Sequence, residues 1–190
     1  MNEAQPGPDG RLRCPWALSA PEYIDYHDRE WGQPVTDVVG LYERLSLEAF
    51  QSGLSWITIL RKREGFRSAF AGFDPETVAQ FDADDFARLM ADPGIVRNRA
   101  KINATIANAQ VVVDLGDRFA ELIWAHRVVD RPRPTGADWR ATSAESVALA
   151  RDLKRAGIRF VGPTTAYALM QAVGLIDDHL IDCFVPPIRP

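Results

Sequence analysis

Residues 89–102, LMADPGIVRNRAKI, place a Pro-Gly turn between two segments with helical patterns. Proline and glycine interrupt a helix, so the stretch predicts a helical hairpin whose second helix begins soon after Gly94. The backbone N–H groups that begin such a helix can hold a phosphate, and cations at alternate positions add attraction. These cations are Arg97, Arg99 and Lys101. Taken alone, the pattern is also that of a solvated turn that carries charges.

Helical patterns continue on both sides of this hairpin. Residues 41–60 carry apolar side chains spaced three and four apart, and Gly53 interrupts them, which predicts two consecutive helices or one broken helix. Acidic or hydroxyl-bearing starts, or glycine ends, mark further helices at 74–81, 82–90, 100–116, 143–157 and 164–174. Strand-like alternation is scarce, so we predict an all-α fold.

The chain length of 190 residues and a hydrophobic content of 46% fit one compact domain over residues 1–190. Residues 1–12, rich in proline, glycine and charge, are expected to form a flexible arm, with order beginning near Cys14. Residues 130–146 are expected to be a surface connection. No apolar run approaches the roughly 18 to 20 residues of a spanning helix, and no secretory signal is visible. We therefore expect a soluble, cytoplasmic protein that makes no membrane contact.

Acidic side chains outnumber basic ones in this chain, 26 against 22. The field of the whole molecule therefore does not favour nucleic acid, and a DNA contact has to come from local clusters of cations. The hairpin carries one such cluster. Residues 61–67, RKREGFR, carry a second that is suited to lie along a duplex.

A carboxylate interrupts an apolar helical stripe in residues 41–52. Side chains spaced by four, three and four line one face of this segment: Leu41, Leu45, Glu48 and Ser52. Glu48 either reaches solvent or a cation at the edge of the stripe, or lies desolvated in a pocket where it can recognise a base edge. Gln51 lies one turn away, and Trp56 is a candidate for either a pocket wall or the core.

The two cysteines and two of the three histidines form a candidate metal site. His179 and Cys183 are four residues apart, which places both on one face of a helix. Cys14 and His27 form a second pair near the other end of the chain, and the resulting Cys2His2 set suits tetrahedral zinc. Four protein ligands leave no open position, so such a zinc is structural. Each residue alone is equally an ordinary buried side chain, and His126 lies outside the set.

These residues together resemble the bacterial 3-methyladenine DNA glycosylase I family, a branch of the helix-hairpin-helix glycosylases. The resemblance runs from about residue 14 to residue 183. It covers the blocks RCPWA, YIDYHDREWGQP, LYERLSLEAFQSGLSWITILRKREGFR, DPGIVRNRAKI, FVGPTTAYALMQAVGLIDDH and the final Cys183. It implies a DNA repair enzyme that flips 3-methyladenine out of alkylated double-stranded DNA and hydrolyses its N-glycosidic bond.

The resemblance also implies roles for individual residues. The structural Zn²⁺ ligands become Cys14, His27, His179 and Cys183, which join residues 14–27 to residues 179–183. The base pocket becomes Trp16, Tyr23, Tyr26, Gln51 and Trp56, with Trp31 in support and Glu48 as the base-recognition and catalytic carboxylate. The nonspecific DNA clamp becomes the hairpin from Gly94 through Arg97 and Arg99 to Lys101. Asp177 departs from the usual asparagine of the family, which puts an interaction behind the metal ligands in doubt.

The resemblance and the leaving group together predict a monofunctional, monomeric glycosylase. A methylated base leaves as a neutral molecule, so little protonation is needed, and no lysine nucleophile next to the hairpin fits the family pattern. Asp114 lies well beyond the hairpin and receives no catalytic role. Two alternatives stay open at this point: a zinc-stabilised module that binds damaged DNA without cutting the bond, and a helical zinc protein with no nucleic-acid role.

Overall fold

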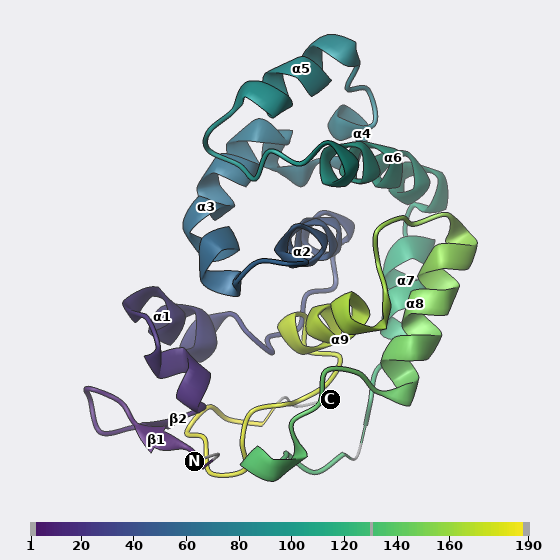
Figure 1. The fold of residues 1–190 in the computed structure, drawn as a ribbon. Coiled ribbons are helices and arrows are strands. Elements are labelled where there is room, and N and C mark those ends of the chain that lie inside the picture. The colour runs from purple at the N-terminus through teal and green to yellow at the C-terminus, as the bar shows by residue number, and fades with distance from the viewer. Residues whose placement is uncertain (1–2, 130, 188–190) are drawn as a thin grey trace.

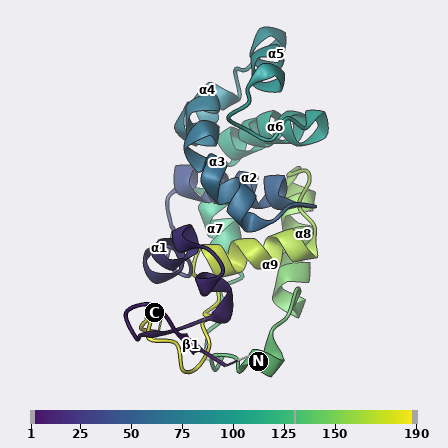
Figure 2. The ribbon, with the colours of Figure 1, turned by 60° about the vertical axis from the view of Figure 1, so that its left-hand side comes forward.

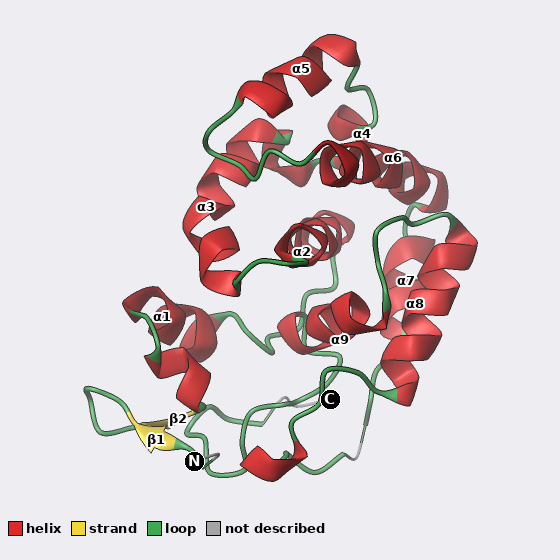
Figure 3. Cartoon of the chain, in the orientation of Figure 1, coloured by secondary structure: helices red, strands yellow, loops and turns green. Residues whose placement is uncertain are grey.

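The computed structural model describes residues 3–129 and 131–187, and helices dominate them (Figure 1). The helices, in chain order, are α1 (Pro21–Arg29), α2 (Val38–Gln51), α3 (Trp56–Ala69), α4 (Pro75–Val78), α5 (Ala83–Ala91), α6 (Arg99–Leu115), α7 (Arg118–Trp124), α8 (Ala144–Ala156) and α9 (Pro163–Ala172). Short 3-10 turns are η1 (Pro15–Leu18), η2 (Ala71–Phe73) and η3 (Gly136–Asp138). The predicted helical fold is confirmed, and Figure 3 shows how little of the chain is extended.

The helix boundaries follow local capping chemistry. The side chain of Asp37 accepts a hydrogen bond from the N–H of Gly40 at the start of α2, and Asn98 caps α6 in the same way. Residues 41–60 form two helices, α2 and α3, because Gly53 between them has a φ of 80°, a left-handed conformation that disfavours other side chains. The sequence patterns did not predict two of the helices, α1 and α7.

Helix α2 lies at the centre of the molecule, as the two views agree (Figures 1 and 2). It packs against α3, α6 and α9, and α9 in turn packs against α8. Nine of the fourteen residues of α2 are buried, so this helix presents almost no face to solvent. A side chain such as Glu48 near its C-terminal end is therefore held inside the protein and not at a solvated edge.

The predicted helical hairpin is present as α5, a short turn and α6. The carboxylate of Asp92 accepts a hydrogen bond of 2.6 Å from the N–H of Gly94, which tightens the turn. Helix α3 supports the hairpin from behind, because Lys62 Nζ donates to the carbonyl of Pro93 at 2.6 Å. Gly65 of α3 packs directly on the backbone of Gly94. The hairpin is thus braced on the helix that follows the central α2.

The N-terminal segment does not form the expected flexible arm. Strand β1 (Gln5–Pro6) pairs antiparallel with β2 (Leu12–Arg13) in a small hairpin. The buried guanidinium of Arg13 donates hydrogen bonds to Asp9 within this hairpin and to Asp28 on α1. Order therefore begins before Cys14, because ion pairs tie the segment down. None of the helices in the described ranges 3–129 and 131–187 combines the length and the apolar character needed to cross a membrane.

Replacing Gly65 with alanine is expected to push the hairpin away from α3. A Cβ at this position would lie 2.5 Å from the carbonyl oxygen of Gly94, and overpacking of this kind costs typically about 1–3 kcal/mol. We expect G65A to lower the free energy of unfolding by that amount in urea denaturation. The matched change E64A, at an exposed neighbour on the same helix, is expected to leave it nearly unchanged. Equal stabilities of the two variants would contradict the close packing.

Candidate active site and metal centre

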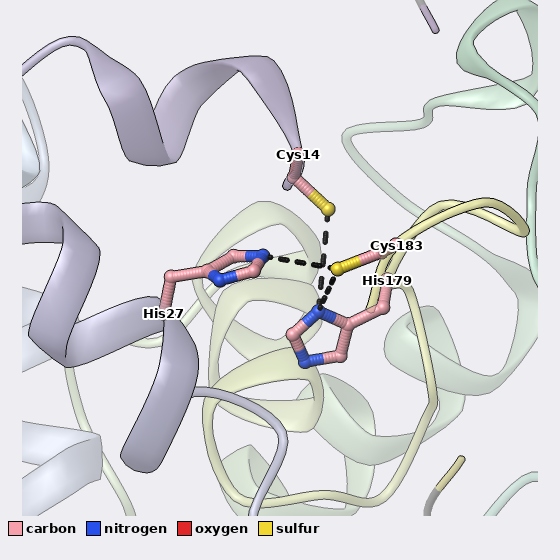
Figure 4. Close-up of side chains that lie close together, drawn as sticks. All are labelled: Cys14, His27, His179 and Cys183. Atoms are coloured by element: carbon pink, nitrogen blue, oxygen red, sulfur yellow. Dashed lines mark hydrogen bonds between the residues drawn. The ribbon is translucent and has the colours of Figure 1, made fainter. Parts of the chain in front are cut away.

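The four predicted metal ligands meet at one buried point (Figure 4). Their ligand atoms all lie within 4.8 Å of one another. Cys183 Sγ is 3.5 Å from His27 Nε2 and 3.6 Å from His179 Nδ1, and Cys14 Sγ is 4.0 Å from that same Nδ1. A tetrahedral ion about 2.3 Å from sulfur and about 2.0 Å from nitrogen separates such ligands by roughly 3.5 Å. The donor set and its spacing therefore fit a metal ion.

The segment that carries His179 and Cys183 differs from the prediction in one respect. It is not a helix but a series of turns that follows α9, closed by a hydrogen bond from Cys183 N–H to the carbonyl of Leu180. The two side chains converge because the chain reverses, and not because they share a helical face. The spacing of four residues therefore correctly predicted that His179 and Cys183 lie together, but a turn and not a helix brings them together.

Hydrogen bonds behind the ligands set the orientation of both imidazole rings. His27 Nδ1 lies 2.8 Å from an oxygen of Asp28, which leaves Nε2 free to face the sulfurs. His179 Nε2 lies 3.2 Å from the carbonyl oxygen of Trp31, which leaves Nδ1 free to face them. The carboxylate and the carbonyl can each accept a hydrogen bond from a ring N–H, so the other nitrogen of each ring can present a lone pair to the cluster. This is the protonation pattern that metal-binding histidines need.

Asp177, which departs from the family pattern, also supports the cluster. Its carboxylate accepts a hydrogen bond of 2.8 Å from Arg133 Nε and one of 3.3 Å from the N–H of His179. Arg133 in turn donates to the carbonyl of Val185. The carboxylate of Asp177, with Arg133 as its partner, therefore holds the turn before His179.

A cavity of about 440 Å³ lies beside the Cys2His2 cluster, within the usual size range of small-molecule sites. All of the predicted pocket residues line it: Trp16, Tyr23, Tyr26, Glu48, Gln51 and Trp56. Trp31 lines it as well and connects it to the cluster, because its ring centroid is 4.6 Å from that of His179 and 5.0 Å from that of Trp16. Helix α1 thus contributes to the Cys2His2 cluster and to the cavity at once.

Glu48 is buried in this cavity wall, with 5% of its surface exposed. Among the described residues it has no hydrogen-bond partner. The nearest influential cation, Arg44, is committed to ion pairs with Glu30 and Glu43. Burial raises the pKa of Glu48 to about 8, and the positive charge of Arg44 opposes this only in part. The alternatives of a solvated or cation-paired Glu48 are therefore wrong, and the desolvated carboxylate is the one observed.

Burial and the nearby carboxylate also act on the tyrosine beside Glu48. Burial raises the pKa of Tyr26 well above its ordinary value, and the negative charge of Glu48 raises it further. The hydroxyl of Tyr26 therefore keeps its proton throughout the physiological range. Its ring lies 5.4 Å from that of Trp56, at a tilt of 44°. The cavity thus offers aromatic faces, phenolic donors and one isolated acid.

Five lining residues were missed in the sequence: Ser19, Trp139, Arg140, Ala168 and Gln171. Trp139 and Arg140 belong to residues 130–146, which were expected to be only a surface connection. The available signal in the sequence was a tryptophan within a polar segment, because an exposed apolar side chain there can mark a binding site. In the structure, 45% of the surface of Trp139 is exposed. Ala168 and Gln171 come from α9, whose pattern reveals a buried face but not the cavity that it adjoins.

The predicted cations of the hairpin divide into two groups. Arg97 and Arg99 are exposed, and Arg99 lies over the ring of Phe86 at 5.0 Å. Lys101 is buried instead, and its Nζ donates to the carbonyls of Phe50 and Ser52, at the end of α2. The prediction that Lys101 contacts DNA is therefore wrong. Its side chain satisfies carbonyls that a helix end leaves without partners.

Most cations of the second predicted cluster, residues 61–67, form ion pairs within the molecule. Arg61 pairs with Glu22, Arg63 pairs with Glu30, and Arg67 pairs with Glu43. These cations join α3 to α1 and α2 and are neutralised by acidic partners. The prediction that this segment lies along a duplex is not supported by these pairings.

Comparison with known proteins identifies the family. The sequence matches the methyladenine glycosylase family over residues 16–186. DNA-3-methyladenine glycosylase 1 of Escherichia coli is 43% identical over 182 residues, which are 92% of this chain and 97% of that protein. This chain belongs to the methyladenine glycosylase family.

Solved structures of the methyladenine glycosylase family agree with the fold. A crystal structure of a 3-methyladenine DNA glycosylase I is 41% identical, has a TM-score of 0.86, and covers 92% of this chain and 100% of its own. A single-residue variant of such an enzyme, solved in complex with 3-methyladenine, is 36% identical and has a TM-score of 0.86. The match covers 94% of this chain and 99% of the chain of that variant. The helical fold is therefore that of the family.

The raised pKa of Glu48 predicts a stability that depends on pH. Between its ordinary value of 4.5 and about 8, the folded protein keeps a proton that the unfolded chain has lost, so the free energy of unfolding falls as pH rises. One group contributes at most about 1.4 kcal/mol per pH unit. We expect E48Q to remove this fall, measured by urea denaturation between about pH 5 and pH 8.

The control for this measurement is E64Q, which alters a largely exposed glutamate on α3. Its stability should follow that of the parent at every pH. If E48Q also follows the parent, Glu48 is not the desolvated group described above.

Proposed function

We propose that this methyladenine glycosylase removes 3-methyladenine from alkylated double-stranded DNA by hydrolysing the N-glycosidic bond of a base flipped out of the duplex. The observation that carries the proposal is the isolated carboxylate of Glu48 in an aromatic cavity. A buried acid without a cation partner is costly for stability, so its retention points to a ligand that supplies the missing charge. A base methylated at N3 is such a ligand.

The cavity favours a cationic purine over a neutral one for two reasons. Aromatic faces attract a cation through their quadrupoles, and stacking of a flipped base contributes roughly 1–3 kcal/mol. The carboxylate of Glu48 adds a full negative charge once it is ionised. Because its pKa is about 8 before the lesion arrives, binding of a cation is expected to draw the proton out of Glu48. Neutral adenine offers no such exchange.

The chemistry follows from the charge already present on the lesion. When the bond between C1′ of the sugar and the base breaks, its electron pair moves to the purine, which departs neutral without a proton from the enzyme. The cationic sugar then takes oxygen from water, and a proton is lost to solvent. The products are a free methylated base and an abasic site. In this scheme Glu48 recognises the cation and holds the base as the bond lengthens.

The environment of the two lysines at the hairpin and its supporting helix, Lys101 and Lys62, supports a monofunctional enzyme. A lyase step needs a lysine amine that is free to attack C1′. Lys101 is buried, with its Nζ bonded to two carbonyls, and Lys62 donates to the carbonyl of Pro93. Neither amine is available as a nucleophile in this arrangement. We therefore assign hydrolysis alone to this chain.

We assign the DNA contact to the hairpin at the start of α6. The exposed cations Arg97 and Arg99 flank a helix N-terminus, and both features attract phosphate without regard to sequence. The net charge of −4 makes this local patch more important, since the remaining surface does not attract DNA. We propose that the chain acts on the duplex as a monomer.

We infer that the Cys2His2 cluster binds Zn²⁺ in a structural role. Two thiolates and two imidazoles suit zinc, and four protein ligands leave no position for a reactive water. The ion would join the segment before α1 to the turns after α9. Since α1 carries Tyr23 and Tyr26, this clasp would hold one wall of the cavity in place.

Replacing Glu48 with glutamine tests the proposed function. The change keeps the shape of the side chain and removes its charge, so we expect release of 3-methyladenine to slow at least about tenfold, the loss of one charge-assisted contact. The kcat/KM of the parent should rise with pH through about 8, as Glu48 ionises, and the profile of E48Q should be flat. Free base released from methylated DNA is measured by chromatography.

The same assay separates the enzyme from its alternative. A module that binds damaged DNA without turnover would release no base above background from the parent protein. A parent that releases base together with an equally active E48Q would contradict the role of Glu48 alone. The exposed variant E64Q serves as the matched control.

Elemental analysis tests the metal. We expect about one zinc ion per chain in protein purified without chelator, and we expect C183S to lose it together with several kcal/mol of stability. D28N, which weakens the support of His27, should lower zinc affinity by about 10–100-fold. H126A is the control, because His126 pairs with Asp152 outside the cluster. Full retention of zinc by C183S would contradict the assignment.

A further inference from the structure

Gln171 is a polar residue in the cavity wall to which the reaction described so far gives no role. It lies on α9, is half-buried, and lines the cavity together with Glu48. Its Nε2 donates a hydrogen bond of 2.8 Å to Asp178 Oδ2. The hydroxyl of Tyr167 donates to the same oxygen at 2.6 Å, and Arg131 Nη2 lies 3.4 Å from the other oxygen. The amide is therefore anchored by a buried, ion-paired carboxylate.

This anchor decides which end of the amide faces the cavity. Asp178 Oδ2 accepts hydrogen bonds from Tyr167 and from Nε2 of Gln171, so the NH2 of Gln171 faces Asp178 and its oxygen does not. A flipped amide would place two acceptors 2.8 Å apart and leave a buried oxygen of Asp178 with one donor fewer. The network thus holds the amide in one orientation, in which the carbonyl Oε1 is the outer atom.

The carbonyl oxygen of Gln171 is open to the cavity. No donor among residues 3–129 and 131–187 bonds to it. It is also absent from the buried side-chain atoms of these residues that lack partners, so it is accessible. Glu48 meets the same two conditions. Once Glu48 is ionised, the cavity therefore presents two open acceptors, one on α2 and one on α9, and a ligand that pairs with both of them has to bring donors.

We propose that Gln171 determines the specificity for purines with an amino group at position 6, by accepting a hydrogen bond from that group at Oε1. The inference rests on the proposed function and deepens it. Adenine carries N6–H2, which can donate to Gln171 and Glu48 together. Guanine carries a carbonyl at position 6. Its oxygen would face the carbonyl oxygen of Gln171, which the hydrogen bond to Asp178 keeps from rotating away, so two acceptors would repel each other. Methylated guanine is then disfavoured even though it bears the same positive charge.

The proposal gives Asp178 a positioning role at one remove from the base. Asp178 does not line the cavity but holds the NH2 of Gln171. An asparagine at this position can partner either end of the amide, so D178N is expected to free Gln171 to turn. Specificity should then relax while Gln171 itself is still present. A purely structural role for Asp178 would lower both activities without changing their ratio.

The test compares two bases released from one substrate. DNA treated with dimethyl sulfate contains both 3-methyladenine and 3-methylguanine, and chromatography measures the release of each. We expect Q171M, which keeps the length of the side chain, to release 3-methyladenine about tenfold more slowly, the loss of one buried hydrogen bond. The rate for 3-methyladenine divided by the rate for 3-methylguanine should fall by a similar factor. D178N should narrow it in the same direction.

A binding measurement separates recognition from turnover. The Kd of free 3-methyladenine, followed by quenching of tryptophan fluorescence, should rise about tenfold in Q171M, while the Kd of 3-methylguanine should not rise. The matched control is Q110M on α6, because Gln110 also donates its amide to an aspartate, Asp114, but on an exposed surface. If circular dichroism or zinc content shows that Q171M does not fold, Q171A replaces it.

The outcomes distinguish this inference from the proposed function. A parent that releases neither base would contradict the function itself. A parent that releases 3-methyladenine, together with a Q171M that keeps the parental ratio of the two bases, would overturn the role of Gln171 and leave the function intact. A narrowed ratio in Q171M with an unchanged ratio in D178N would overturn the positioning role of Asp178.

Discussion

The convergence of Cys14, His27, His179 and Cys183 on one point is the constraint on which the site depends. Two of these ligands precede or lie in α1, and two lie in the turns after α9, so the cluster brings together the two ends of the described chain. Trp31 packs against His179 and Trp16, which extends this constraint into the cavity wall. The aromatic segment around α1 therefore forms a wall of the cavity, and its contacts with the cluster hold it in place.

The charges of this acidic chain are used locally. Arginines of α3 pair with glutamates of α1 and α2, and the central ion pair of Arg63 with Glu30 is partly buried. These contacts brace the lobe that carries the hairpin, and they leave few cations for DNA. Arg97 and Arg99 remain exposed at the start of α6. A chain with a net charge of −4 can thus still present a small positive patch.

The cavity contains two polar side chains that lack a hydrogen-bond or charge partner for one of their groups. Glu48 loses hydration in a helix that is almost wholly buried, and its raised pKa is the sign of that cost. Gln171 presents a carbonyl without a donor, yet its amide nitrogen is firmly held. A cationic base with an amino group would supply the partner that each of these two side chains lacks. Recognition of this kind relies on acceptors that are fixed before the ligand arrives, so a base that lacks the matching donors leaves them unpaired.

Most of the helices and their caps were predictable from the sequence, because capping and periodicity act over a few residues. Part of the cavity lining was predictable as well: Glu48 from its place on an apolar helical stripe, and most of the aromatic residues only from the resemblance to the family. The Cys2His2 cluster was predictable as a set, although the turn that brings His179 and Cys183 together was expected to be a helix. Tertiary structure alone decided that Lys101 is buried, that Trp139 and Arg140 reach the cavity, and which end of the Gln171 amide faces a ligand. Each of these depends on a partner far away in the chain, such as the carbonyl of Phe50 for Lys101, and the local pattern does not encode where that partner lies.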